Sequence, residues 1–288
     1  MPTAIPHLLT WARDILIKAG VPSPQADAEW TLAHVLECAR SELLMRAHQP
    51  LTPAQSATFR TLIHRRAGRI PLQHLLGNTE FYGLPFHTSP DALIPRPETE
   101  TLVEVVLKQL NTCTNPRILD IGTGSGIIAI TLGKSLTGSH VIATDISRKA
   151  LCLARQNAHL NRVSDRISFL QTDLLTPFAK PESFHAILSN PPYIPSNAID
   201  ALQPEVRNCD PRLALDGGRD GLDFYRKIIP TSVPLLARGG LLGLEIGHDQ
   251  ARAVTQLLSR QIGLTHIITH TDLSGYPRAV LARATANC

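Results

Sequence analysis

The sequence predicts an α/β protein in which a largely parallel sheet carries helices on both faces and follows a small helical bundle. From Asn115 onward, short apolar runs alternate with helical patterns, as expected when crossover helices join parallel strands. Before about Arg69, apolar residues recur at helical spacing instead. We therefore expect a helical bundle over residues 1–75, a hairpin linker over 76–96 and a main domain over 97–288.

The first part has the start signals of helices. Ser23 before Pro24, and Thr52 before Pro53, each predict an N-cap followed by proline in the first turn. The third helix ends with a basic group that predicts either a solvated face or a docking surface for a partner: Arg60, His64, Arg65, Arg66 and Arg69.

The linker and the main domain can be divided in the same way. Residues 81–86 predict a short hairpin, and Pro97 predicts the first turn of a helix over 98–110 with Glu98 near its positive end. In the main domain we expect a mostly parallel sheet of seven strands: 117–121, 140–144, 167–171, 184–189, 241–246, 265–270 and 278–283. The helices expected between them are 126–136, 147–160, 222–236 and 248–261.

A glycine-rich turn separates the first strand of this sheet from its helix. It runs from Asp120 to Gly126 with the spacing Asp-x-Gly-x-Gly-x-Gly. Ile127 replaces the third glycine of a dinucleotide fingerprint, and no Gly-Lys-Ser/Thr of a phosphate loop follows. An acidic residue ahead of the turn suits a cationic ligand such as S-adenosylmethionine. The cofactor-binding candidates here are Asp120, Gly122, Thr123, Gly124, Ser125 and Gly126.

The next two strands also end in carboxylates. Asp145 follows the second strand, where an acidic side chain usually binds ribose hydroxyls. Asp173 follows the third strand and is placed to accept a hydrogen from an adenine amine, with Leu174 against the ring. A plain helix cap is the alternative for Asp145, and a structural role is the alternative for Asp173.

The fourth strand ends in Asn190-Pro191-Pro192-Tyr193. The Asn190 side-chain oxygen and the Pro191 carbonyl can each accept one N–H of a planar NH2 group, and Tyr193 offers a flat face for stacking. The two prolines stiffen the turn. An ordinary turn is the alternative, but all these residues follow strand ends, where ligands bind in parallel sheets.

Together, these motifs resemble class I S-adenosylmethionine-dependent methyltransferases that act on a planar nitrogen. The segments 81–86, 93–100 and 275–280 narrow the resemblance to the HemK/PrmC family, the glutamine methyltransferases of peptide chain release factors. That resemblance implies that Leu93, Arg96 and Glu98 border the substrate pocket, although a helix cap and linker would explain them equally well.

The resemblance implies a release factor glutamine as methyl acceptor. Asn190, Pro191 and Tyr193 are then catalytic, Asn190 also contacts the cofactor, and the substrate contacts are Asn190, Pro191, Pro192, Tyr193, Arg96 and Glu98. The helical bundle would contact the protein partner. A ribosomal protein glutamine, an exocyclic amine of a nucleic acid and a non-enzymatic cofactor sensor are the alternatives.

Composition excludes several other classes. The net charge of +4 is small for a dedicated DNA-binding protein, so we expect no stable binding to nucleic acid. Five cysteines, Cys38, Cys113, Cys152, Cys209 and Cys288, form no C-x-x-C pair and predict reduced thiols. We expect no metal, no signal peptide and no membrane-spanning stretch, and a monomer in the cytoplasm.

Overall fold

The chain forms two compact units in the computed structural model, which describes residues 4–175, 178 and 183–285. The first unit comprises the chain up to Asn78 together with the segment Gln203–Cys209. The second comprises Thr79–Leu202 and Asp210–Cys288. The functional division at residues 75 and 96 stays a prediction, and Cys288 lies outside the described residues.

The first unit is helical, as the apolar spacing predicts. Its elements are α1 (Ile5–Lys18), α2 (Pro24–Val35), η1 (Arg40–Leu43), α3 (Pro53–Ala67), α4 (Leu72–Leu76) and α8 (Pro204–Cys209). The Thr52 hydroxyl accepts from the Gln55 N–H, and the Gln55 side chain accepts from the Thr52 N–H, which completes a capping box at α3. Ser23 occupies the N-cap position of α2, but its side chain makes no capping hydrogen bond.

The basic group at the end of α3 is only partly a solvated face. Arg66 is buried, and its guanidinium lies 2.7 Å from Asp27 Oδ2 and 2.9 Å from Glu205 Oε1. Arg69 also donates to Glu205, and the Arg60 guanidinium stacks over the Trp11 ring. The prediction of a solvated face is therefore wrong for Arg66, because two buried carboxylates from distant parts of the chain require a buried cation.

The second unit contains the seven-stranded sheet, in the order β5-β4-β3-β6-β7-β9-β8. Five strands are parallel, whereas β9 is antiparallel to β7 and to β8. The bounds are β3 (Arg117–Ile121), β4 (His140–Asp145), β5 (Ile167–Gln171), β6 (Phe184–Ser189), β7 (Leu236–Glu245), β8 (Leu264–Thr271) and β9 (Pro277–Ala284). This confirms the predicted mostly parallel seven-stranded sheet. A separate hairpin pairs β1 (Asn78–Phe81) with β2 (Leu84–His87).

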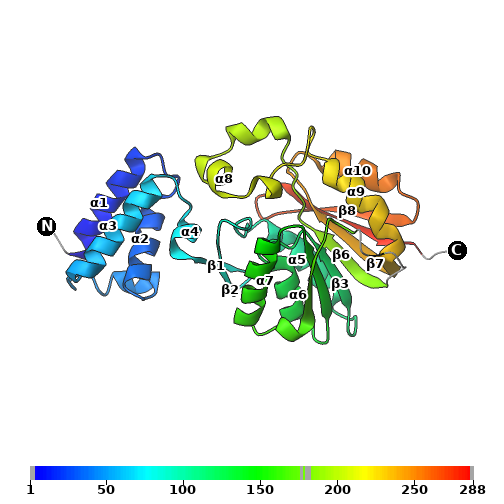
Figure 1. Ribbon diagram of the computed structural model, residues 1–288, viewed down its shortest axis with the longest axis horizontal. Helices are drawn as coiled ribbons and strands as arrows, with labels where there is room; N and C mark the ends of the chain where they lie inside the picture. The colour runs from blue at the N-terminus through cyan, green and yellow to red at the C-terminus, as the bar shows by residue number, and fades with distance from the viewer. Residues whose placement is uncertain (1–3, 176–177, 179–182, 286–288) are drawn as a thin grey trace. The chain divides into compact units, whose positions relative to one another are not determined.

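Helices cover both faces of the sheet (Figure 1). On one face lie α5 (Thr99–Leu110), α6 (Ile127–Ser135) and α7 (Arg148–Leu160). On the other lie α9 (Asp223–Ser232) and α10 (Ala251–Ser259). The strands bury side chains on both sides, so Ile118 of β3 belongs to the α5–α6 core and Leu119 to the α9–α10 core. This alternation is the period of two that a strand imposes.

Two regions differ from the predicted elements. Strand β7 begins at Leu236 rather than at 241, and α9 ends at Ser232 before a short 3-10 helix, η5 (Val233–Leu235). Pro234 inside that turn cannot donate a helical hydrogen bond, so the helix ends early. The segment after Tyr193 forms two further 3-10 turns that the pattern did not predict: η3 (Ser196–Ala201) and η4 (Arg212–Ala214). A last short turn is η2 (Ser164–Arg166).

Among the described helices, none has the length and apolar character that crossing a membrane requires.

The strand order reverses between β3 and β6. The chain adds β4 and β5 on one side of β3, and β6 and β7 on the other. Parallel sheets bind ligands in the crevice beyond such a reversal. The turn after β3 is therefore held next to the turn after β6.

Gly126 is needed for packing behind this crevice. Its φ is +89°, and a Cβ placed there would lie 2.8 Å from Ile130 Cδ1 and 3.2 Å from Ala154 Cβ. Ile130 belongs to α6 and Ala154 to α7, so a side chain at this position would force the two helices apart.

We expect Gly126→Ala to lower the free energy of unfolding by about 2–4 kcal/mol, combining overpacking with a left-handed φ. Gly83→Ala is the matched control, because its φ is +70° and a Cβ there meets nothing within 4 Å. It should cost only about 1–2 kcal/mol. Urea denaturation measures both. Equal losses in the two variants would contradict the packing role of Gly126.

Candidate functional site

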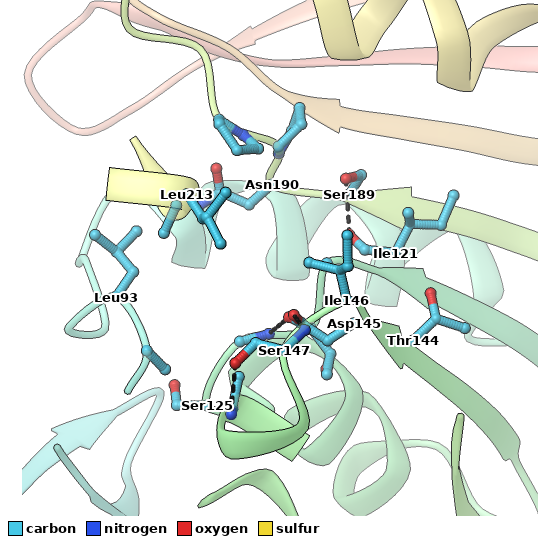
Figure 2. Close-up of a pocket in the computed structure, with 18 of the residues that line it drawn as sticks. Leu93, Ile121, Ser125, Thr144, Asp145, Ile146, Ser147, Ser189, Asn190 and Leu213 are labelled. Atoms are coloured by element: carbon cyan, nitrogen blue, oxygen red, sulfur yellow. Dashed lines mark hydrogen bonds between the residues drawn. The ribbon is translucent and has the colours of Figure 1, made fainter. Parts of the chain in front are cut away.

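A cavity of about 270 Å³ lies beyond the carboxyl ends of the parallel strands in the second unit (Figure 2). Figure 2 shows Asn190 and Ser125 on opposite sides of this cavity, with Asp145 along a third side and Leu93 facing it. The predicted site residues that line it are Gly122, Thr123, Gly124, Ser125, Asp145, Asp173, Leu174, Asn190, Pro191, Pro192, Leu93 and Arg96. Tertiary folding thus brings the four predicted strand-end motifs to one cavity.

The glycine turn leaves one wall of the cavity open. Gly122 and Gly124 have φ values of +70° and +56°, and a Cβ at either would meet nothing within 4 Å. The Gly124 N–H donates to Asp145 Oδ2 at 2.9 Å, which joins the turn to the end of β4. Glycine is therefore suited to both positions, because it adopts positive φ without strain and leaves space for a ligand.

Asp120 and Gly126 lie behind the turn and are not among the lining residues. The Asp120 carboxylate accepts from Thr123 Oγ1 at 2.6 Å and from the Ala129 N–H at 3.2 Å. It is completely buried, and burial raises its pKa to about 7. In this geometry Asp120 ties the turn to the first turn of α6.

Asp145 faces the cavity with a fixed carboxylate. Oδ2 accepts from Gly124 N–H, as described, and Oδ1 accepts from the Ser147 N–H at 2.8 Å. Burial raises its pKa above the ordinary value, and the backbone donors oppose that shift. Each carboxylate oxygen retains acceptor capacity, so Asp145 can accept from ligand hydroxyls. Asp173 and Leu174, after β5, line the same cavity.

Asn190 presents its side chain to the cavity from the end of β6. Its Nδ2 donates to Thr99 Oγ1 at 3.2 Å, which directs the NH2 side of the carboxamide away from the ligand space. Pro191 and Pro192 also line the cavity, whereas Tyr193 does not. The Tyr193 ring packs with the α9–α10 core, and burial raises the pKa of its phenol to about 12.

The main chain of this turn is clamped from behind. Gln250 Nε2 donates to the Tyr193 carbonyl at 2.9 Å. The Ile194 N–H donates to the Leu215 carbonyl, and the Ile194 carbonyl accepts from the Gly217 N–H. A Cβ on Gly217 would lie 2.8 Å from the Pro192 carbonyl oxygen. Only a residue without a side chain allows the main chain to approach this closely.

Arg96 and Glu98 have different surroundings. Arg96 lines the cavity, and its Nη2 donates to Asp210 Oδ2 at 2.7 Å, where the Asp210 side chain is almost fully buried. Glu98 is exposed at the start of α5 and is not among the lining residues.

Several residues at this site carry no motif in the sequence. Thr99 contacts Asn190, and Lys227, Phe224 and Leu213 line the cavity from α9 and η4. Glu245, at the end of β7, is buried beside Asn190. One signal was present: Glu245 is the single charge within the apolar run 241–246.

The residues present fit the predicted cofactor. The open space over Gly122 and Gly124 admits a flat or extended ligand, and Asp145 supplies acceptors for vicinal hydroxyls. The cavity walls are largely apolar, which suits an adenine ring and a thioether chain. Among the described residues, no group of three or more His, Cys, Asp or Glu side chains is arranged to hold a metal ion.

Comparisons with known proteins cover both units. Residues 7–77 match the family described as PrmC N-terminal domain, and residues 98–219 match the methyltransferase small domain. A release factor glutamine methyltransferase from Geobacter sulfurreducens is 42% identical over 97% of this chain and 96% of its own length. A protein of the same name from Moorella thermoacetica is 45% identical over 86% of this chain and 87% of its own.

Solved structures are similar as well. A protein-(glutamine-N5) methyltransferase from Alicyclobacillus acidocaldarius is 31% identical, with a TM-score of 0.43 over 70% of this chain and all of its own. A methyltransferase from Pyrococcus furiosus reaches a TM-score of 0.52 at 18% identity, over 71% of this chain and 91% of its own, and shows the shared fold.

The buried carboxyl of Asp120 predicts a pH dependence of stability. Its pKa rises from 3.8 to about 7 on folding, so the folded state binds more protons between these values and loses stability as pH rises from about 4 to 7. The Asp120→Asn variant lacks this loss of stability. The difference in free energy of unfolding, variant minus wild type, should therefore increase as pH rises from about 4 to 7. Urea denaturation at several pH values measures it. Asp165→Asn, at an exposed site, is the control; the same pH trend in both variants would contradict the assignment.

Proposed function

We propose that this chain, which belongs to the family of the release factor glutamine methyltransferases, transfers a methyl group from S-adenosylmethionine to a protein glutamine. The acceptor is the side-chain amide nitrogen in the Gly-Gly-Gln motif of peptide chain release factors, and the reaction supports translation termination. The family predicted from the sequence is confirmed. One observation supports the assignment at the site: the turn that begins at Asn190, which offers acceptors for a carboxamide, and the glycine turn, which suits a nucleoside, line the same cavity.

The chain's own residues hold the cofactor. Bound S-adenosylmethionine would supply an electrophilic methyl carbon. Asp145 accepts from the ribose hydroxyls, Asp173 and Leu174 contact the adenine, and the glycine turn permits close approach of the main chain. Asp120 keeps that turn in place through Thr123.

Asn190 and Pro191 hold the acceptor amide. An amide nitrogen is a weak nucleophile, because its lone pair is delocalised into the carbonyl. The Asn190 oxygen and the Pro191 carbonyl accept its two N–H groups, orient the nitrogen and favour the positive charge that develops there. After transfer this nitrogen is strongly acidic, so water or a carbonyl accepts its proton. Tyr193 supports the turn from the core side, which its burial favours over direct stacking on the substrate.

Two charged residues and the helical unit complete the proposed contacts with the protein substrate. Arg96, held by Asp210, borders the cavity and contacts the loop that carries the glutamine. Glu98, at the start of α5, contacts the protein substrate further from the reacting atoms. The helical unit docks the release factor, the enzyme acts as a monomer in the cytoplasm, and it binds no nucleic acid stably.

A labelling experiment tests the acceptor. The protein is incubated with methyl-labelled S-adenosylmethionine and, in separate reactions, a release factor, ribosomal proteins and DNA. We expect label in the release factor, on the Gly-Gly-Gln glutamine when the peptide is mapped by mass spectrometry. A release factor whose motif is Gly-Gly-Glu is the control and should remain unlabelled. Label confined to ribosomal protein or to DNA would assign one of the rival acceptors.

Asn190→Ala removes one of the two acceptors for the substrate amide. We expect kcat to fall on the order of 100-fold, because an acceptor aimed at the reacting group is lost. Affinity for S-adenosylmethionine, measured by calorimetry, should change far less. Asn197→Ala, an exposed site in η3, is the control and should keep wild-type kinetics. Wild-type turnover in Asn190→Ala would remove Asn190 from the mechanism.

A further inference from the structure

A buried carboxyl lies behind the acceptor turn without contacting the cavity. Glu245 is the last residue of β7 and is only 1% exposed. Leu244 pairs with Ser189 in the parallel register of β7 and β6, so Glu245 and Asn190 are the next residues of adjacent strands. Burying a carboxylate is costly unless it is hydrogen bonded, and nothing in the binding of cofactor or substrate described above uses this group.

Glu245 lies next to both Asn190 and Thr99. Asn190 Nδ2 donates to Thr99 Oγ1 at 3.2 Å. Hydrogen bonding from the Thr99 and Asn190 side chains opposes the rise that burial causes in the pKa of Glu245. Among the described residues, the buried Glu245 Oε2 has no hydrogen-bond partner in the resting geometry. Thr99 is fully buried at the start of α5. Because the Thr99 hydroxyl accepts from Asn190, its single proton is left for an acceptor such as the neighbouring Glu245 carboxylate.

These contacts determine the rotation of the Asn190 carboxamide. An ionised carboxylate can only accept hydrogen bonds. The NH2 side of Asn190 must therefore face Glu245 and Thr99, and its Oδ1 must face away from them. A flipped carboxamide would place its oxygen against the carboxylate and leave the NH2 group to meet the substrate's own NH2.

We propose that Glu245, acting with Thr99, is a positioning residue that directs Asn190 Oδ1 toward the N–H of the acceptor amide. This inference rests on the proposed function, because it requires an acceptor that donates an N–H. It adds a role for two residues that never touch the substrate.

The charge state of Glu245 is part of this role. Burial raises its pKa to about 7, while Thr99, Arg278 and Asn190 favour the ionised form and Glu98 opposes it. Tyr193 and Tyr225 also face the carboxyl from the acceptor turn and from α9. The Tyr225 hydroxyl donates to the Glu245 main-chain carbonyl at 2.8 Å. Once protonated, the carboxyl can donate to the Asn190 oxygen and no longer excludes the flipped carboxamide.

Glu245→Gln tests the inference, because glutamine has the same shape but both donates and accepts. We expect kcat for a release factor to fall on the order of 10- to 100-fold, as for other losses of orientation. The decline of wild-type kcat as pH falls through about 7 should disappear in the variant. Affinity for S-adenosylmethionine by calorimetry and the thermal midpoint should stay close to wild type, which a merely structural defect would not allow.

Thr99→Val is the second variant if Glu245→Gln does not fold, and it should reproduce the loss of kcat. Glu104→Gln, an exposed site on α5 that pairs with Lys108, is the control and should keep wild-type kinetics. The side-chain amide signal of Asn190 in NMR spectra should shift with pH in wild type and not in Glu245→Gln.

The outcomes separate the two claims. A wild-type enzyme that leaves the release factor unlabelled overturns the proposed function. A wild-type enzyme that labels it, with unchanged kcat and pH profile in the Glu245 and Thr99 variants, overturns the positioning role alone.

Discussion

The site depends on the parallel pairing of β3 with β6. Ile121 pairs with Ser189, and the Ser189 hydroxyl donates to the Ile121 carbonyl at 2.8 Å. The residues that follow, Gly122 and Asn190, therefore leave the sheet from neighbouring positions less than about 5 Å apart in the hydrogen-bonding direction. The chain winds outward in opposite directions from this pair, so the turns after β3 and β6 border a crevice between them. The residues predicted to bind the methyl donor and the acceptor then line one cavity.

Around this crevice, fully or partly buried carboxylates hold main chain and side chains in place. Asp120 supports the glycine turn and Asp145 joins that turn to β4. Glu245 faces the carboxamide of Asn190. Asp120 and Glu245 are fully buried and Asp145 is partly buried, and burial raises the pKa of all three. Such groups are costly for stability, and they are retained where orientation of a neighbour matters more than the free energy of burial.

The helical unit uses buried charge differently. Arg66 lies between Asp27 and Glu205, so opposite charges compensate each other. The segment Gln203–Cys209 that carries Glu205 comes from the middle of the methyltransferase sequence and belongs to the helical unit. The ion pairs hold this inserted segment against α2 and α3, where truncating one partner leaves an uncompensated charge.

Much of the fold was predictable because its signals are local. Strands such as Arg117–Ile121 and Phe184–Ser189 were predicted with their observed bounds, since each is a short apolar run bounded by turn residues. The glycine turn and the Asn-Pro-Pro-Tyr turn were predicted for the same reason. The 3-10 turns between Ser196 and Ala214 were not, because they follow contacts with the rest of the fold rather than any periodicity.

The sequence by itself determined the order of elements, the family and the residues at four strand ends, because each depends on residues close together in the chain. Tertiary structure alone decided which distant residues surround the functional and buried charged side chains. Arg66 is buried because Asp27 and Glu205 converge on it, and Tyr193 faces the core because Gln250 and Gly217 hold its turn. Glu245 meets Asn190 only through the pairing of β6 with β7. Such partners lie tens of residues apart, and only the register of the sheet and the packing of helices bring them together.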